Sequence, residues 1–230
     1  SVFFTNVNTG YVASSGGIIF KTTDAGTTWS AQTIGSSQIL KSVYFANANI
    51  GYAVGYNGTI IKTSNGGTNW EVRTTGVTST FYSVYFTDAN TGYAVGFKTN
   101  PTSTSIKTIN GGANWAMQPS ALLTNYFFSV YFTDANTGYT VGQSGTILKT
   151  TDAGVSWTSQ TSGSTDQLNS VYFTDSNNGY IVGVGGTILK TSNAGANWTK
   201  QISGTFNNLN SVYFTDANTG YAVGSDYSYW

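Results

Sequence analysis

The strongest constraint on this chain is a segment of fourteen residues that occurs three times. "SVYFTDANTGYAVG" spans residues 83–96 and 211–224 without a change, and residues 129–142 with Thr140 in place of alanine. Aligning all related segments gives six unit starts, at Ser1, Ser42, Ser83, Ser129, Ser170 and Ser211. The spacing is 41 residues except between the third and fourth starts, where it is 46. A fixed period in this range is typical of repeat architectures, in which each copy packs against its neighbours.

Each unit predicts four short β-strands. The first, such as Ser42–Phe45, is β-branched and aromatic, and a polar D-A-N-T-G type of turn leads to a second strand such as Gly51–Gly55. A third strand such as residues 146–150 is followed by a tight turn and a fourth strand that begins on tryptophan. These tryptophans are Trp29, Trp70, Trp115, Trp157 and Trp198. Four strands in about 41 residues are the size of one propeller blade.

The fold class predicted is therefore all-β, a β-propeller of four-stranded antiparallel blades with five full units and a half unit. The prediction treats residues 1–230 as a single domain whose last unit, starting at Ser211, is incomplete. Six blade positions are preferred, and a truncated seven-blade ring is the alternative. An incomplete blade exposes strand edges, and a net charge near zero does little to oppose association, so self-association through the last blade is predicted.

The turn before each tryptophan resembles a known motif. It reads TTDAGTTW at residues 22–29 and TTDAGVSW at 150–157. This resembles the Asp box, S/T-x-D-x-G-x-x-W, of bacterial neuraminidase (BNR) repeats. The whole unit, in which V-Y-F-x-D-x-N-x-G-Y-x-V-G precedes the box, resembles the photosystem II assembly/stability-factor repeat, which also occurs in secreted bacterial proteins. The resemblance covers essentially the whole chain, and it implies the propeller fold far more specifically than any activity.

The box residues are predicted to be structural. They alternate between acid and amide in the series Asp24, Asn65, Asn110, Asp152 and Asn193. Asparagine caps its own turn as aspartate does, but it cannot act as a general acid or base. The D-x-N-x-G turns that begin at Asp88, Asp134, Asp175 and Asp216 match a calcium loop only in part, because no glutamate stands at the twelfth position. No metal site and no cofactor are predicted.

Composition excludes several classes of partner. Lys+Arg and Asp+Glu number 9 each, and Arg73 is the single arginine. A neutral chain lacks the basic surface that a nucleic-acid backbone requires, so no nucleic acid is predicted. No apolar run approaches the roughly 20 residues of a membrane span, so no membrane insertion is predicted. A surface rich in Ser, Thr, Asn, Gly and Tyr favours a bacterial protein that is secreted or at the cell surface.

The sequence predicts no enzyme and no catalytic residue. Sialidases share the Asp box, but resemblance to them implies three substrate-binding arginines, and the chain has one. Other glycosidases need two carboxylates about 5–9.5 Å apart. Outside the repeated positions only Glu71, Asp166 and Asp226 are acidic, and they lie in different units. Nucleophile systems based on histidine or cysteine are absent because the chain has neither residue.

The copies differ in the loops between second and third strands and in the connections between units. These segments are expected on the face opposite the boxes, and binding residues are often carried by such loops. Each connection ends in a pair whose first member is large and apolar, which predicts a core position at Leu40, Phe81, Phe127, Leu168 and Leu209. The candidate ligand-binding residues on this face are Lys41, Tyr56, Tyr82, Phe97, Lys98, Tyr126 and Phe128. The alternative is that these rings merely cover a longer local loop.

Exposed aromatic side chains stack on sugars or anchor protein partners. The function predicted is a non-catalytic secreted or cell-surface propeller that acts as a protein-interaction or adhesion scaffold. A carbohydrate-binding propeller is the alternative, ranked second because equivalent sugar sites would repeat their residues in every blade. A chaperone like the photosystem assembly factors ranks third, because that resemblance implies an arginine-rich patch and the chain has one arginine. The predicted partner is thus a protein or a glycan.

Overall fold

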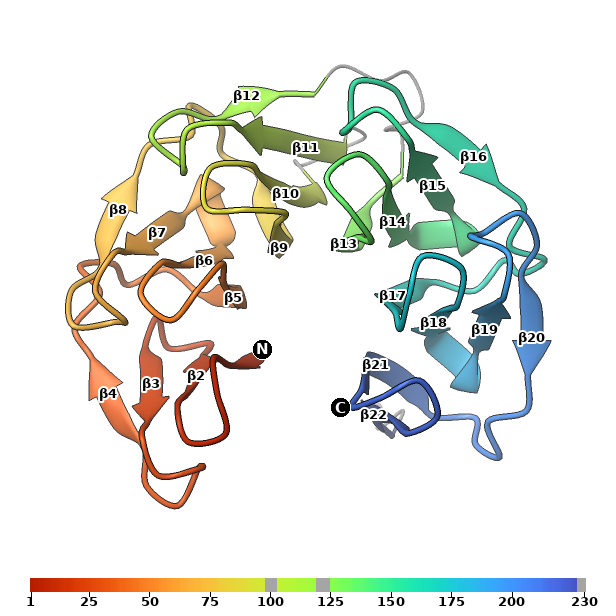
Figure 1. Ribbon diagram of the computed structural model, residues 1–230, viewed down its shortest axis with the longest axis horizontal. Helices are drawn as coiled ribbons and strands as arrows, with labels where there is room; N and C mark the ends of the chain where they lie inside the picture. Colours follow the sequence, from red (N-terminus) through yellow and green to blue (C-terminus); the bar gives the residue numbers. More distant parts are fainter. Residues whose placement is uncertain (98–102, 119–124, 227–230) are drawn as a thin grey trace. The chain divides into compact units, whose positions relative to one another are not determined.

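The computed structural model describes residues 1–97, 103–118 and 125–226, which consist mainly of short strands and turns. The strands form five four-stranded antiparallel sheets and one two-stranded sheet, which confirms the all-β prediction and the four-strand unit. Within every sheet the strands follow one another in chain order (Figure 1). None of the helical segments in the described residues has the length and apolar character to cross a lipid bilayer.

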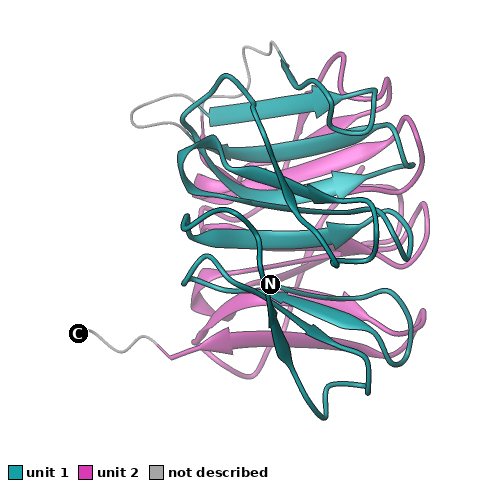
Figure 2. Cartoon of the chain, turned by 90° about the vertical axis from the view of Figure 1, so that its left-hand side faces the viewer, with its two compact units in different colours: residues 1–118 teal, residues 119–230 magenta. Residues whose placement is uncertain are grey.

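Residues 1–118 form one compact unit, drawn in teal in Figure 2. Sheet 1 consists of β1 (Val2–Phe4), β2 (Gly10–Ala13), β3 (Ile19–Thr22) and β4 (Ser30–Gln32). Sheet 2 consists of β5 (Leu40–Phe45), β6 (Gly51–Gly55), β7 (Ile60–Thr63) and β8 (Glu71–Arg73), with the short 3-10 helix η1 (Tyr56–Gly58) after β6. Sheet 3 consists of β9 (Thr80–Phe86), β10 (Gly92–Phe97), β11 (Ser103–Thr108) and β12 (Ala116–Met117).

Residues 119–230 form the second compact unit, drawn in magenta in Figure 2. Sheet 4 consists of β13 (Phe127–Phe132), β14 (Gly138–Gly142), β15 (Ile147–Thr150) and β16 (Thr158–Gln160), with η2 (Gln143–Gly145) after β14. Sheet 5 consists of β17 (Leu168–Phe173), β18 (Gly179–Gly183), β19 (Ile188–Thr191) and β20 (Thr199–Gln201), with η3 (Val184–Gly186) after β18. Sheet 6 consists of β21 (Asn208–Phe214) and β22 (Gly220–Ser225).

The strands match the predicted pattern with small shifts at their ends. The fourth strands begin one residue after tryptophan, as β4 does at Ser30, so the tryptophan belongs to the turn and not to the strand. The first strands of sheets 2–6 begin before the repeated tetrapeptide S-V-Y-F. They include the large apolar residue that was predicted to be in the core. These five residues are buried, which confirms that prediction: Leu40, Phe81, Phe127, Leu168 and Leu209.

Sheets 1 and 2, and likewise sheets 4 and 5, are joined by the same apolar set. Between sheets 1 and 2, the buried residues from sheet 1 are Tyr11, Ala13 and Ile19, and those from sheet 2 are Leu40, Val43, Phe45, Ala53, Ile61 and Trp70. Between sheets 4 and 5, the equivalent residues are Tyr139, Val141 and Ile147 on one side and Leu168, Val171, Phe173, Ile181, Leu189 and Trp198 on the other. The repeated letters of the sequence thus bury equivalent faces at these two junctions.

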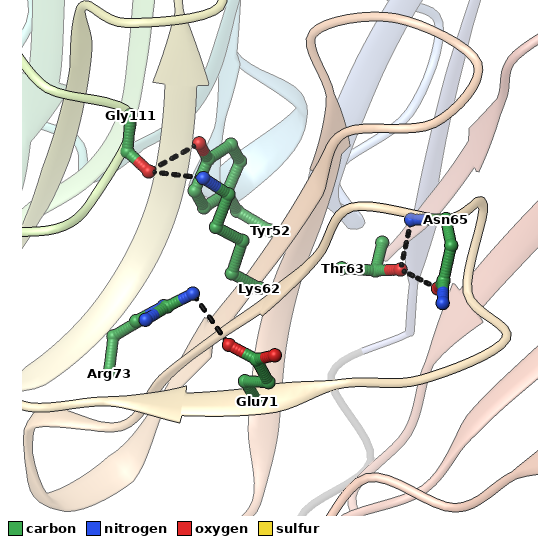
Figure 3. Close-up of polar contacts among 7 residues, drawn as sticks. All are labelled: Tyr52, Lys62, Thr63, Asn65, Glu71, Arg73 and Gly111. Atoms are coloured by element: carbon green, nitrogen blue, oxygen red, sulfur yellow. Dashed lines mark hydrogen bonds and ion pairs between the residues drawn. The ribbon is translucent and has the colours of Figure 1, made fainter.

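A pair of hydrogen bonds crosses each of these junctions. In sheet 2 the buried Tyr52 hydroxyl and the Lys62 ammonium both donate to the carbonyl oxygen of Gly111 in sheet 3, at 2.9 and 2.7 Å (Figure 3). Tyr11 and Lys21 of sheet 1 donate in the same way to the Gly66 carbonyl, at 2.8 and 2.7 Å. The accepting residue always directly follows the Asp or Asn of a box, so the box turn is part of the interface between sheets.

Candidate functional site

The box turns are closed by their own Asp or Asn side chain. Asp24 accepts hydrogen bonds from the Thr22 hydroxyl at 2.7 Å and from the backbone N–H of Thr28 at 2.9 Å. Hydrogen bonds from the Thr28 side chain, then from its backbone N–H and from Thr22, lower the pKa of Asp24 to about 2. Asn65 accepts the equivalent bonds from Thr63 and Asn69, at 3.0 and 2.9 Å. The same turn therefore forms with a charged or a neutral side chain.

The choice between Asp and Asn follows the residue four positions later. In the two aspartate boxes that residue carries a hydroxyl, which donates to the second carboxylate oxygen: Thr28 to Asp24 at 2.5 Å, and Ser156 to Asp152 at 2.6 Å. In the three asparagine boxes it is Asn69, Asn114 or Asn197, whose backbone N–H makes the common bond. An amide NH₂ cannot accept a hydroxyl proton, so this second hydrogen bond is particular to the two aspartate boxes.

The D-x-N-x-G turns are also closed by their first side chain. The Asp88 carboxylate accepts from the backbone N–H groups of Asn90 and Thr91, at 2.6 and 2.8 Å. Asn47, in the same position of sheet 2, accepts from Asn49 and Ile50 at 3.0 and 2.9 Å. No group of three His, Cys, Asp or Glu side chains that could hold a metal ion occurs in residues 1–97, 103–118 and 125–226.

The acidic residues outside the repeated positions each have a local partner. Glu71 pairs with Arg73 at 2.7 Å along β8 (Figure 3). Asp166 accepts from the Thr187 and Ser164 hydroxyls at 2.7 and 3.1 Å, and these bonds, the Thr187 bond first, lower its pKa. Asp226 accepts from the Asn207 side-chain amide. Within each unit, the described contacts bring no two of these carboxylates together as a catalytic pair.

The first strand of every sheet from 2 to 6 contains a β-bulge. In sheet 2 the register passes from Leu40 opposite Gly55 to Ser42 opposite Val54, which leaves Lys41 without a cross-strand partner. The equivalent extra residues of the other sheets are Tyr82, Phe128, Asn169 and Asn210. These are the variable second members of the connection pairs. A bulge re-aims the side chain of its extra residue, so the variable position is also the one that points out of the regular ladder.

The glycine opposite each bulge is required by close approach of the backbone. A Cβ atom on Gly55 would overlap the carbonyl oxygen of Ile39, the residue before Leu40. That carbonyl instead accepts a hydrogen bond from the backbone N–H of Tyr56 at 3.0 Å. The bond ties the loop after β6 to the connection before β5, so these two variable segments lie together at one edge of the sheet.

Four of the predicted ligand-binding residues form one surface on the first unit, which we call the bulge patch: Lys41, Tyr56, Tyr82 and Phe97. The Lys41 ammonium lies 5.0 Å from the Tyr56 ring centroid and 5.7 Å from that of Tyr82, within the range of cation–π attraction. Tyr82 stacks on Phe97 with centroids 5.6 Å apart and an angle of 20° between the rings. All four residues are half-buried.

Burial raises the pKa of the Tyr82 hydroxyl, with a smaller contribution from Tyr56. Tyr82 therefore stays a neutral donor and acceptor throughout the physiological range. The patch thus combines flat apolar rings, two phenol hydroxyls and one ammonium group, and of these the aromatic side chains are enriched at the energetic centres of protein interfaces.

The other predicted ligand-binding residues are not part of the bulge patch. Phe128 is the bulge residue of β13, and the Tyr126 carbonyl accepts from the Gln143 backbone N–H at 2.9 Å, so both occupy equivalent positions in the second unit. Lys98 lies outside the described residues. The bulge itself was not predicted from the sequence. Its signal was present, since units two to six carry a Val-Gly pair near the end of the second strand. In the structure this glycine lies opposite the large apolar residue that precedes the extra one.

A family model described as photosynthesis system II assembly factor YCF48 matches the sequence over residues 74–165 and, in an overlapping match, over residues 120–207. Together these matches extend over residues 74–207, more than half of the 230 residues. No curated protein matches the sequence at a significant level.

Solved structures with the same fold are distant in sequence. YCF48 from Cyanidioschyzon merolae superposes with a TM-score of 0.68 at 15% identity, covering 98% of this chain and 92% of that one. A structure of YCF48 bound to D1 peptide gives 0.56 at 15% identity, covering 98% and 89%. The GH74 enzyme of Niastella koreensis gives 0.80 at 18% identity, covering 98% of this chain and 44% of that one. The propeller fold predicted from the repeats is confirmed.

Proposed function

The chain belongs to the family of the photosynthesis system II assembly factor YCF48, and from that membership we propose that it is a non-catalytic propeller that binds a protein segment on the bulge patch. The observation that supports the proposal most is the sharing of one cation between two rings. Lys41 lies over both Tyr56 and Tyr82, and Tyr82 stacks on Phe97. The rings hold one another in place, so little side-chain entropy is lost when a partner binds.

The patch fits an extended segment that offers an apolar side chain and a carboxylate. The apolar side chain packs on the Tyr82–Phe97 stack, and the carboxylate pairs with the Lys41 ammonium. A solved structure shows YCF48 bound to D1 peptide, which supports a peptide as the class of ligand. Arg73, the single arginine, is already paired with Glu71, so the cation of this proposal is a lysine.

The absence of catalysis is part of the same proposal. The aspartates of the boxes and of the D-x-N-x-G turns accept hydrogen bonds within their own turns, and their pKa values are lowered where a shift is resolved. A carboxylate held in that way is a poor proton donor at neutral pH. We place the protein outside the cell or on the cell surface of a bacterium, in an adhesion or scaffold role, on the basis of its low content of charged residues and its richness in Ser, Thr, Asn, Gly and Tyr.

Panning a random peptide display library on the whole chain tests the proposal. Selected peptides should lose about thirtyfold in affinity for a Tyr82→Ala variant, the size expected of an aromatic anchor. Asn210→Ala is the matched control, because it alters the equivalent bulge position of sheet 6 and should leave the affinity unchanged. Peptides that bind both variants as well as they bind the original chain would refute the proposal.

A lectin is the second candidate, because the half-buried Tyr82–Phe97 stack also suits a sugar ring. A glycan array probed with and without calcium separates the two candidates. Saturable binding that is lost in Tyr56→Ala or Phe97→Ala would favour the lectin. A blank array together with selected peptides would favour the protein-binding scaffold. A photosystem assembly role ranks third and would require binding to a D1-derived peptide.

A further inference from the structure

Sheets 5 and 6 are in contact along one part of their junction, and the other part is an open groove. The inner contacts repeat those of the other junctions: the Tyr172 hydroxyl donates to the Phe214 carbonyl at 3.1 Å, and the Tyr180 ring stacks on Phe214 at 4.2 Å. Sheet 6, however, has only two strands among the described residues. Every residue of β22 is exposed, although the same letters are buried as Gly92–Gly96 in sheet 3, where β11 pairs with β10.

The open half is a groove of about 260 Å³ with a defined set of walls. It is lined by Tyr180, Val182, Ile188, Gln201, Val212, Phe214, Gly220, Tyr221 and Ala222. Tyr180, Val182 and Ile188 are the counterparts in sheet 5 of Tyr139, Val141 and Ile147 in sheet 4. At the junction of sheets 4 and 5 those three residues are covered in part by Leu189 and Trp198, which come from the third strand and the box turn of sheet 5. The groove is therefore shaped for one leucine or isoleucine and one tryptophan.

The Tyr180 hydroxyl and the Lys190 ammonium lack the carbonyl acceptor that the equivalent groups of sheets 2 and 4 have. Tyr139 and Lys149 donate to the Ala194 carbonyl at 2.8 and 2.7 Å, as Tyr52 and Lys62 do to Gly111. In sheet 5 the Lys190 ammonium lies 5.4 Å from the Tyr180 ring centroid, in the same arrangement. Neither group donates a hydrogen bond to any residue in the described part of the chain. A carbonyl oxygen of a box turn is the acceptor that fits both.

We propose that β22 is a strand-addition site for a β-hairpin of the third-and-fourth-strand type, with the sequence pattern T-I-L-K-T, an Asp-box turn and tryptophan. The register is fixed by the equivalent sheets, in which Gly138 pairs with Thr150, Tyr139 with Lys149 and Thr140 with Leu148. In sheet 6 the hairpin threonine lies opposite Gly220, its lysine opposite Tyr221 and its leucine opposite Ala222. Its box carbonyl then accepts from Tyr180 and Lys190, and its tryptophan fills the groove.

The probe is a labelled synthetic peptide with the sequence of residues 187–201, titrated into the whole chain by fluorescence anisotropy. We expect saturable binding that Tyr180→Phe weakens about fivefold, the effect of one hydrogen bond. Tyr139→Phe is the matched control, because its hydroxyl serves the junction of sheets 4 and 5, and it should leave the affinity unchanged. Alanine at the tryptophan of the peptide should abolish binding.

Absence of saturable binding at millimolar peptide, or equal binding by the Tyr180→Phe variant, would overturn the proposal. Light scattering under the same conditions completes the test. A monomer is expected, and a dimer that an excess of the peptide fails to dissociate would assign the edge to a second copy instead. The site lies on residues other than the bulge patch, so its failure and the failure of the proposed function are separate results.

Discussion

The carbonyl oxygen of Gly111 accepts hydrogen bonds from both Tyr52 and Lys62. From this arrangement we predict how much substitution of each residue lowers the free energy of unfolding. Tyr52 is fully buried, so Tyr52→Phe removes one intramolecular hydrogen bond with a net value of about 1 kcal/mol. The carbonyl keeps its 2.7 Å bond from Lys62, so no unsatisfied group is created. Lys62→Met removes the other donor, and because that lysine is half-exposed we expect a similar loss of about 1 kcal/mol.

The double variant should lose more than the sum of the two. With both donors removed the buried carbonyl has no partner, which adds a desolvation cost of about 1–3 kcal/mol. The free energy of unfolding is measured by urea titration at 25 °C, followed by tryptophan fluorescence, with circular dichroism to verify that each variant is folded. We expect the single variants to lose about 1 kcal/mol each and the double variant about 3–5 kcal/mol.

Tyr180→Phe is the matched control, because this hydroxyl donates no hydrogen bond within the described residues. It should change the free energy of unfolding by less than about 0.5 kcal/mol. The reasoning is refuted if the double variant is strictly additive, or if Tyr180→Phe costs as much as Tyr52→Phe.

Three further predictions concern the turns, the bulge and pH. Asp24→Asn alone should lower the melting temperature, and adding Thr28→Asn should restore part of it; a double variant less stable than both singles would contradict the paired roles. Gly55→Ala should cost about 2–3 kcal/mol of unfolding free energy through overlap with the backbone, and a neutral result in the same urea titration would refute the close approach. Because the pKa of Asp24 is about 2, below its usual 3.8, stability present above pH 3.8 should fall as the pH drops toward 2. Because the pKa of Tyr52 is about 12, above its usual 10.0, stability present below pH 10 should fall as the pH rises toward 12; melting temperatures that stay flat in either range would count against these linkages.

The sequence was sufficient to predict the sheets because each of the five complete units contains all four strand segments, and the copies can be compared with one another. A β-branched and aromatic run followed by an Asx-type turn and Gly-Tyr-Ala-Val-Gly has few other structures available. It also predicted the buried role of Leu40 and its equivalents, since a position that varies only among large apolar residues is a core position. The interchange of Asp and Asn in the boxes pointed to turns closed by a side-chain oxygen, and the structure contains such turns at Asp24 and Asn65.

The tertiary hydrogen bonds could not be predicted in the same way. Lys62 and Tyr52 recur in every complete unit, but periodicity alone does not show that both reach one carbonyl of the next sheet. The bulge likewise depends on a backbone approach at Gly55 that no propensity records. The grouping of Lys41 with Tyr56, Tyr82 and Phe97 was predicted from loop position, whereas the cation–π and stacking geometry that orders them required coordinates.

The bulge has a consequence for how such a chain can evolve. In sheet 2 the extra residue, Lys41, is outside the β5–β6 register and absent from the apolar set that joins sheets 1 and 2, so substitutions there leave that packing intact. A gene segment can therefore be duplicated whole, with every packing residue, and each duplicate can then change at one tolerant position per copy. Lysine, tyrosine, phenylalanine and asparagine already occupy that position in this chain. Duplication supplies the scaffold, and divergence at the bulges changes the chemical group from one copy to another, although sheets 5 and 6 share asparagine.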